Sequence, residues 1–509
     1  MLSMGGFIAH PVVLTVLAVV AVVGCTATVW AILRSPTKAD TDAIAQQIKD
    51  LESKVTLGPE YLDGLPAAVN QKLRAAYQEA RLLQLEGYEA QSREKHEEAI
   101  DRFTRALALA ENDSQRAALH ILRGNSHSLI SQYNGAQADY EEALRLADRI
   151  SAAPDAAQIR SAALGNLGLV CERRGELEKA EEHLKHGLEI DRAIGDRLGE
   201  AGKLCNLGAV YSDRADLGKA EEHHRLSLKI CRDIRNQAGE AENLGDLGII
   251  YRLHGDLEKA EEYHNHALSI EEQVGNPRGQ ANQLVNLGGV HLERGELNKA
   301  ADHFERALKI YKEAGNRLGE SWSLDNLGLV YRGRGEFDKA EEYHKQGLDL
   351  DREIGNRLGE AASLNNLGLV YRCRGDLDDA EDCHNKALDI HREVGDRLGE
   401  ANALGNLAVI YHLRGDLESA QEYHRRALHL HMQVGNRLGE ANDLTELGLV
   451  YTDRGDVEQA REHLESAQTI YQQIGAGDEG PEIVRRALER IEEQERQQRE
   501  GGEEEQPEG

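Results

Sequence analysis

The stretch GNRLGESWSLDNLGLVYRGRGEFDKAEEYHKQGLDLDREI, residues 315–354, decides the fold because the chain repeats it. A second copy, GNRLGEAASLNNLGLVYRCRGDLDDAEDCHNKALDIHREV, follows at residues 355–394. One leucine marks every copy, at Leu167, Leu207, Leu247, Leu287, Leu327, Leu367, Leu407 and Leu447. Self-similarity at a fixed period is typical of an array of stacked units. The sequence predicts eight regular forty-residue repeats over 155–474 and two divergent ones over 68–150, about ten in all.

Each repeat is expected to form two helices. In the first half of the copy at 315–354, the apolar and small residues share one helical face at Leu324, Leu327, Gly328 and Tyr331. In the second half, the corresponding buried positions are Phe337, Ala340, His344 and Leu348. Gly335 and Gly355 are expected to end the two helices, because glycine readily takes the left-handed cap conformation. Asp256, Asp376 and Asp416 each follow such a glycine and are expected to cap the next helix.

These residues resemble tetratricopeptide repeats, with Leu327-Gly328, Tyr331, Ala340 and Gly347 or Ala387 at the family's small and large positions. The forty-residue length is similar to the arrays of kinesin light chains and of the partner-of-inscuteable family. The resemblance covers about 68–475 and implies an all-α, right-handed α-solenoid that binds a peptide or protein in its concave groove. No G-protein-binding motif follows the repeats, and no long leading heptad region precedes them, so neither specific role is carried over.

An asparagine precedes the marker leucine in six repeats, at Asn166, Asn206, Asn286, Asn326, Asn366 and Asn406. In several members of the family this position lines the inner groove. The resemblance therefore implies a row of amides, each with a donor and an acceptor, that could hold an extended peptide backbone. Asn365, Asp325 and Trp322 lie on neighbouring turns and are expected to tune selectivity. The alternative is that each Asn hydrogen-bonds within the array.

A histidine recurs in the second helix at His224, His264, His344, His384 and His424, with Phe304 once in its place. Metal ligands must lie within about 2.0–2.1 Å of the ion, and equivalent positions of adjacent repeats are too far apart for that. The phenylalanine also favours packing, so no metal or other cofactor is expected. Arginines of the inter-repeat turns are expected to pair with local glutamates, at Arg197, Arg317, Arg357, Arg397 and Arg437 with Glu200, Glu320, Glu360, Glu400 and Glu440.

Composition excludes several classes of function. The formal net charge of -30 disfavours nucleic-acid binding, which needs clustered Lys and Arg. The six cysteines form no CxxC pair and are expected to be free thiols. The sequence contains no nucleophile elbow, P-loop or HExxH, so we expect a non-catalytic protein.

Residues 11–33, after a short segment at 1–10, carry no charge and are long enough for one transmembrane helix. Arg34 and Lys38 follow, which places the repeats in the cytoplasm by the positive-inside rule. An alternative is an envelope lipoprotein or periplasmic assembly factor anchored through Cys25, because Val22-Val23-Gly24-Cys25 resembles a lipoprotein cleavage box.

The segment 34–67 is expected to hold a juxtamembrane amphipathic helix, whose apolar spacing over 42–55 suits a coiled coil in a homodimer, and a linker. Residues 475–499 are expected to form a capping helix, with Ile483, Val484, Leu488 and Ile491 on one stripe. The last residues, 500–509, are expected to be an acidic disordered tail. Together these features predict a single-pass membrane scaffold that binds a protein or peptide partner.

Overall fold

The computed structural model describes residues 95–110, 112–151, 153–474 and 479–503, which are helical and contain no strand. The segments 1–10, 11–33 and 34–67, with the transmembrane helix, Cys25 and the dimerising helix 42–55, lie outside these residues, as does 504–509. Within the described residues, no helix combines the length and apolarity needed to cross a membrane. The helices are α5(His96–Leu109), α6(Asp113–Leu129), α7(Tyr133–Ala147), α8(Ala153–Arg173), α9(Leu177–Ile194), α10(Arg197–Asp213), α11(Leu217–Asp233), α12(Gln237–Leu253), α13(Leu257–Val274), α14(Pro277–Glu293), α15(Leu297–Glu313), α16(Arg317–Gly333), α17(Phe337–Ile354), α18(Arg357–Arg374), α19(Leu377–Val394), α20(Arg397–Leu413), α21(Leu417–Val434), α22(Arg437–Arg454), α23(Val457–Ile474) and α24(Glu479–Glu503).

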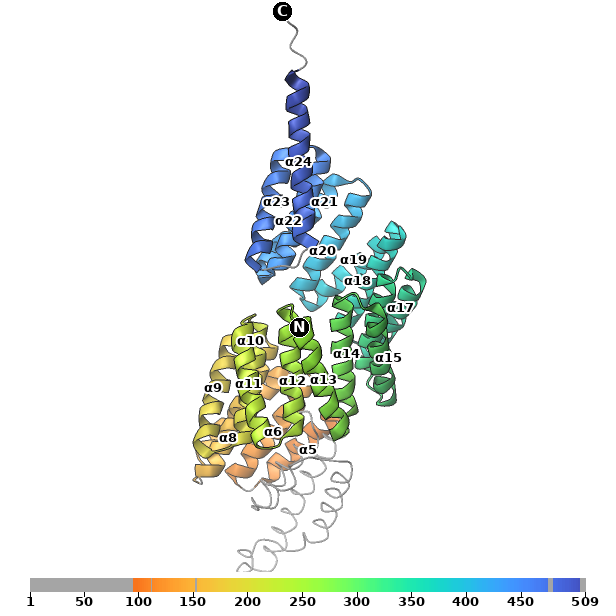
Figure 1. Ribbon diagram of the computed structural model, residues 1–509. Helices are drawn as coiled ribbons and strands as arrows, with labels where there is room; N and C mark the ends of the chain where they lie inside the picture. Colours follow the sequence, from red (N-terminus) through yellow and green to blue (C-terminus); the bar gives the residue numbers. More distant parts are fainter. Residues whose placement is uncertain (1–94, 111, 152, 475–478, 504–509) are drawn as a thin grey trace, which may run out of the picture. The chain divides into compact units, whose positions relative to one another are not determined.

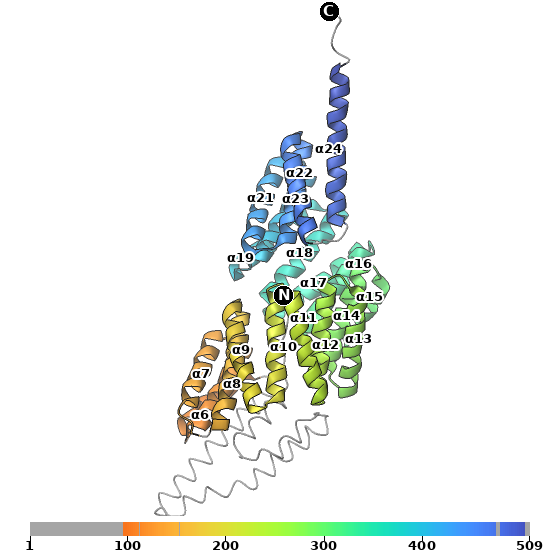
Figure 2. The same ribbon diagram turned by 60° about the vertical axis from the view of Figure 1, so that its left-hand side comes forward.

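The chain divides into two compact parts, Met1–Val290 and His291–Gly509, which we call the N-terminal and C-terminal parts. Each is a stack of antiparallel helix pairs, such as α10 with α11 and α18 with α19 (Figure 1, Figure 2). Even-numbered helices from α6 to α22 are the first helices of their repeats, and odd-numbered helices are the second. Consecutive first helices also contact one another, as α8 does α10 and α16 does α18. The first helices present one surface on the side opposite the second helices. We call this surface the first-helix face.

The motif between repeats encodes a sharp reversal of the chain. Gly355 ends α17 with a φ of 71°, in the left-handed region that glycine adopts without a Cβ penalty. Asn356 then caps α18, since its Oδ1 accepts a hydrogen bond from the Gly359 amide at 3.2 Å. The five inter-repeat arginines pair with their glutamates as predicted, for example Arg317 with Glu320 at 2.9 Å. These local contacts set the angle at which one repeat follows another.

Within a repeat, the predicted aspartate caps form at two of three sites. Asp256 and Asp416 accept hydrogen bonds from backbone amides at 3.1 Å. The prediction for Asp376 was wrong: its side chain makes no capping bond, and its carboxylate lies 3.7 Å from Arg374 instead. The backbone dihedral angles of Asp376 are nevertheless similar to those of Asp256 and Asp416. The ion pair therefore redirects the side chain and leaves the turn intact.

The glycine after the marker leucine gives room to one side chain of the second helix. A Cβ on Gly328 would lie 2.5 Å from His344 Cε1, and Gly368 faces His384 in the same way. This glycine therefore lets the imidazole ring of the second helix approach the backbone of the first helix closely. The histidines and Phe304 are at most 1% exposed, which confirms that the column packs in the core.

At the end of the C-terminal part, α24 covers the apolar side of the last repeat. Val484 and Ile491 are fully buried against a cluster that includes Leu447 and Tyr471, with Leu488 packed beside it. Ile483, placed on the same stripe in the sequence analysis, is 39% exposed. The helix runs to Glu503, beyond the expected end at residue 499.

Candidate functional site

The asparagine row lies on first helices, but its members are not equivalent. Asn166 and Asn206 are buried, whereas Asn286, Asn326, Asn366 and Asn406 are half-buried. Asn166 Nδ2 donates a hydrogen bond to Asn125 Oδ1 at 2.9 Å, so this amide serves the interior of the array. Asn326 Nδ2 donates to the carbonyl of Trp322 in its own helix at 2.8 Å. Trp322 itself is half-buried on the preceding turn.

Three amides of the row remain available to a ligand. Asn286, Asn366 and Asn406 make no hydrogen bond with another residue in the described part of the chain. Each can offer an amino donor and a carbonyl acceptor from the first-helix face.

Asp325 and Asn365 serve the interior of the array. Asp325 accepts hydrogen bonds from His344 Nδ1 at 2.8 Å and from Ser363 Oγ at 2.7 Å. Asn365 accepts from His384 Nδ1 at 3.1 Å. Both residues therefore hydrogen-bond to buried histidines, although each directly precedes an asparagine of the row.

Every buried histidine of the column has a polar partner nineteen residues away, on one of two sides. His344 and His384 use the first helix of their own repeat, as just described. The others use the first helix of the next repeat: His224 pairs with Asn243, His264 with Gln283 and His424 with Asp443. Phe304, which needs no partner, has Val285 and Ser323 at these two positions. The residue of the column and the residues nineteen positions before and after it therefore decide to which first helix the second helix is hydrogen-bonded.

Burial holds these imidazoles in the neutral form. Desolvation lowers the pKa of His264 to about 4, although the hydrogen bond that His264 Nδ1 donates to Gln283 Oε1 opposes the shift. Desolvation likewise lowers the pKa of His384 to about 3, and the nearby charge of Arg372 adds to the effect. Nε2 of both rings is buried without a hydrogen-bond partner among the described residues, as expected if Nδ1 carries the only proton.

Two arginines that are not among the predicted site residues lie on the same first helices as Asn326 and Asn366. Arg332 and Arg372 lie at equivalent positions of α16 and α18, and both are half-buried. Within the described residues, neither guanidinium has a hydrogen bond or an ion pair. Burial lowers the pKa of Arg332, and the positive charge of Arg372 lowers it further, against an opposing effect of Cys373. The pair is a concentration of positive charge without an internal counter-ion.

Neighbouring arginines behave differently. Arg374 pairs with Glu341 at 2.7 Å and with Asp338 at 2.9 Å, both on the preceding second helix. Arg414 makes the equivalent pairs with Glu381 and Asp378. The recurrence of arginine at residues 332 and 372, six residues beyond Asn326 and Asn366, was the signal in the sequence that could have identified the pair.

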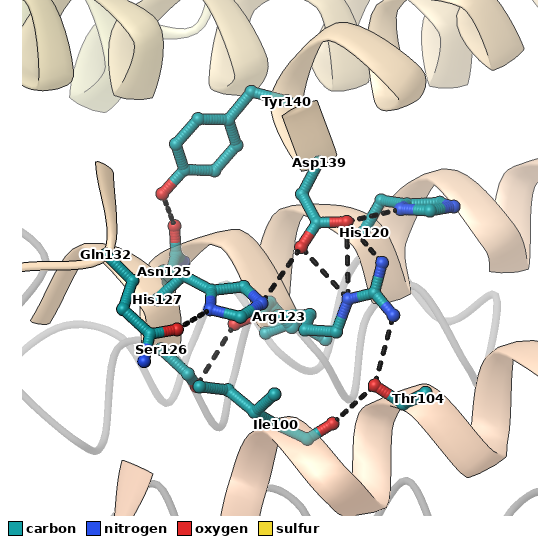
Figure 3. Close-up of polar contacts among 11 residues, drawn as sticks. Ile100, Thr104, His120, Arg123, Asn125, Ser126, His127, Gln132, Asp139 and Tyr140 are labelled. Atoms are coloured by element: carbon teal, nitrogen blue, oxygen red, sulfur yellow. Dashed lines mark hydrogen bonds and ion pairs between the residues drawn. The ribbon is translucent and has the colours of Figure 1, made fainter. Parts of the chain in front are cut away.

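A second polar cluster, in the N-terminal part, is fully engaged within the protein (Figure 3). Asp139 on α7 is 3% exposed and accepts hydrogen bonds from Arg123 Nη2 and His120 Nδ1, both at 2.7 Å. Burial alone would raise the pKa of Asp139, but these two partners bring it below its usual value. Arg123 also donates to Thr104 on α5 at 3.0 Å, so the cluster joins three successive helices. We assign it a structural role.

Sequence comparison identifies the repeats. Models of the tetratricopeptide repeat match residues 163–198, 199–273, 280–353, 359–431 and 444–466, more than half of the chain. The chain belongs to the tetratricopeptide repeat family. No curated protein matches this sequence significantly.

Several solved structures are similar to this tetratricopeptide repeat protein. BtubC (BKLC) from P. vanneervenii has 21% sequence identity over 45% of this chain and 92% of its own, with a TM-score of 0.37. Aspartyl phosphate phosphatase F from Bacillus subtilis has 15% identity over 72% of this chain and 97% of its own, with a TM-score of 0.49. A Rap protein complexed with competence and sporulation factor has 17% identity over 70% and 99%, with a TM-score of 0.49. This similarity is too low to carry the functions of those proteins over.

Proposed function

We propose that the first-helix face of α16, α18 and α20 binds an extended protein segment that carries acidic side chains. The observation that carries the proposal is the half-buried pair Arg332 and Arg372, which has no counter-ion within the described residues. A partly desolvated guanidinium is costly unless it is paired, and a carboxylate is the partner that its planar fork fits best.

The amides beside the arginines suit the backbone of the same ligand. Asn366 and Asn406 are free to donate to a peptide carbonyl and to accept from a peptide N–H. Packed helices lie about 8–10 Å apart and an extended chain rises about 3.3 Å per residue, so adjacent repeats would meet ligand residues about three positions apart. We therefore expect carboxylates at a spacing of about three residues in the ligand.

The net charge of -30 does not oppose this assignment, because the local charge differs from the global one. On the first-helix face of α16, α18 and α20, the positions at the spacing of the asparagine row carry no Asp or Glu: they are Trp322, Asn326, Leu329, Arg332, Ala362, Asn366, Leu369, Arg372, Asn402, Asn406, Val409 and His412. Close-range pairing outweighs distant charges at physiological salt, where the screening length is about 8 Å.

Replacing both arginines, Arg332→Gln with Arg372→Gln, should weaken binding of an acidic peptide by more than about 100-fold, since each charge-assisted hydrogen bond contributes about 1.5–3 kcal/mol. The measurement is fluorescence anisotropy of a labelled Leu/Gly peptide with Glu at every third position, compared with the same peptide carrying Gln. The double change Asn366→Ala with Asn406→Ala should weaken both peptides alike, because amides contact the backbone. Arg306→Gln with Arg426→Gln removes the same charge from exposed positions of second helices and should change nothing. Equal binding of the two peptides by the wild-type chain would contradict the proposal.

We further propose that residues 11–33 anchor this scaffold in a membrane, with the repeats in the cytoplasm. Twenty-three successive uncharged residues support an anchor. The full chain should remain in the membrane fraction after an alkaline wash, and deletion of 11–33 should release it. Cys25→Ser should leave fractionation unchanged; release of this variant would favour the lipoprotein alternative instead.

A further inference from the structure

Three side chains with metal-ligand atoms converge in the N-terminal part, away from the proposed peptide site. They are Cys205 on α10, His224 on α11 and Asp246 on α12, and their ligand atoms all lie within 4.8 Å of one another. Cys205 Sγ is 3.7 Å from Asp246 Oδ2, and His224 Nδ1 is 3.5 Å from the same oxygen. No other group of three such donors comes together in the part of the chain that the structure describes.

These separations match those between ligands of one zinc ion. With Zn–S near 2.3 Å and Zn–N and Zn–O near 2.1 Å, a tetrahedral site places sulfur about 3.6 Å from the oxygen and nitrogen about 3.4 Å from it. The observed 3.7 Å and 3.5 Å differ from these values by about 0.1 Å. The three helices therefore hold the donor atoms close to a metal-binding geometry.

Within the described residues the chain assembles this set at one place, where two adjacent repeats depart from the common pattern. Asp246 stands where six other repeats carry asparagine, and Cys205 occupies the position of Asp325 and Asn365. His224 also has the longest polar contact of its column, at 3.3 Å to Asn243, whereas the other four histidines have contacts of 2.8–3.1 Å. Among the five histidines, His224 therefore has the Nδ1 atom that is most readily available to a metal ion.

The charge of the surroundings favours a cation. No Lys or Arg side chain of the described residues pairs with Asp246. The carboxyl groups of Asp213 and Asp246 lie near that of Glu172, which concentrates acidic groups around the cluster. A divalent ion would balance one thiolate and one carboxylate. The side chain of Asp246 is 29% exposed, which gives an ion a route from the first-helix face.

We propose that Cys205, His224 and Asp246 bind one zinc ion through Sγ, Nδ1 and a carboxylate oxygen, with water at the fourth position. A thiolate with an imidazole selects zinc over calcium or magnesium, which prefer oxygen ligands alone. The ion joins the first and second helices of one repeat to the first helix of the next. The proposal is independent of peptide binding, which concerns residues of the C-terminal part.

Two of the test variants use residues that the chain itself accepts at equivalent positions. Asp246→Asn installs the residue of the asparagine row, and His224→Phe installs the counterpart of Phe304. Cys205→Ser removes the thiolate at nearly constant volume. His264→Phe and Cys383→Ser are the matched controls, because each is buried but outside the cluster.

The experiment uses the full chain, stripped with a chelator and titrated with Zn²⁺, and separately with Co²⁺ to report ligand type by absorption. The wild-type chain and both controls should bind one equivalent and show a thiolate-to-cobalt charge-transfer band. Each cluster variant should lose the band and bind zinc more than about 100-fold more weakly, since loss of even a supporting contact costs about 10–100-fold. Cobalt bound only by some of the chain's 21 histidines would give no such band. Absence of the band in the wild-type chain, or unchanged zinc affinity in Cys205→Ser, would overturn the proposal.

Discussion

Replacement of Asp139 by alanine is expected to lower the free energy of unfolding by about 3 kcal/mol. Removal of one partner of a buried ion pair typically costs about 3–5 kcal/mol, because the other charge stays behind without compensation. Here Arg123 and His120 would remain, with side chains 22% and 18% exposed, so we expect the lower end of that range. Urea unfolding followed by circular dichroism measures the change.

The control for this prediction is Asp378→Ala. Asp378 also pairs with an arginine, Arg414, but its side chain is fully exposed, so its loss should cost less than about 0.5 kcal/mol. If Asp139→Ala were as mild as Asp378→Ala, the cluster of Figure 3 would not be the lock between α5, α6 and α7 that its contacts indicate.

The second large effect is a loss of stability in mild acid through the buried histidines. His264 has a pKa of about 4 in the folded chain, below the usual value of 6.5, so between these values the unfolded chain binds a proton that the folded chain does not. Stability is therefore unaffected above pH 6.5 and falls as the pH drops towards 4, by about 3 kcal/mol in total and about 2 kcal/mol by pH 5.

A matched variant isolates this contribution. His264→Phe with Gln283→Ser reproduces the pair Phe304 and Ser323, which the chain already contains. The wild-type chain should lose about 2 kcal/mol more than this variant between pH 7 and pH 5. His254→Gln, at an exposed helix end, should follow the wild-type chain. Parallel pH profiles for the wild type and the double variant would show that His264 is not held neutral by the fold.

The sequence predicted the repeat period, the helix pairs, the glycine ends and the buried histidine column, because each depends on residues within one repeat. It did not predict which polar residues of the first helices hydrogen-bond to the buried histidines. Asp325 and Asn365 sit one residue before the asparagine row, yet they bind histidines nineteen residues later. That relation depends on which of two neighbouring helices carries a polar residue, and the side differs from repeat to repeat without a regular order.

The two candidate sites were missed for a related reason. Arg332 and Arg372 are visible in the sequence, but so are Arg374 and Arg414, and only the structure separates unpaired from paired guanidinium groups. Cys205, His224 and Asp246 come from three helices and two repeats, so no single spacing within one repeat reveals them.

Reversal of the charge of Arg332 and Arg372 tests most directly whether these two residues bind the acidic side chains of an extended ligand. In the variant Arg332→Glu with Arg372→Glu, the preference between two labelled peptides, with Glu or with Lys at every third position, should invert from acidic to basic. Arg306→Glu with Arg426→Glu, the same change on second helices, should retain the acidic preference. A variant that still preferred the acidic peptide, or a wild-type chain that preferred the basic one, would contradict the account.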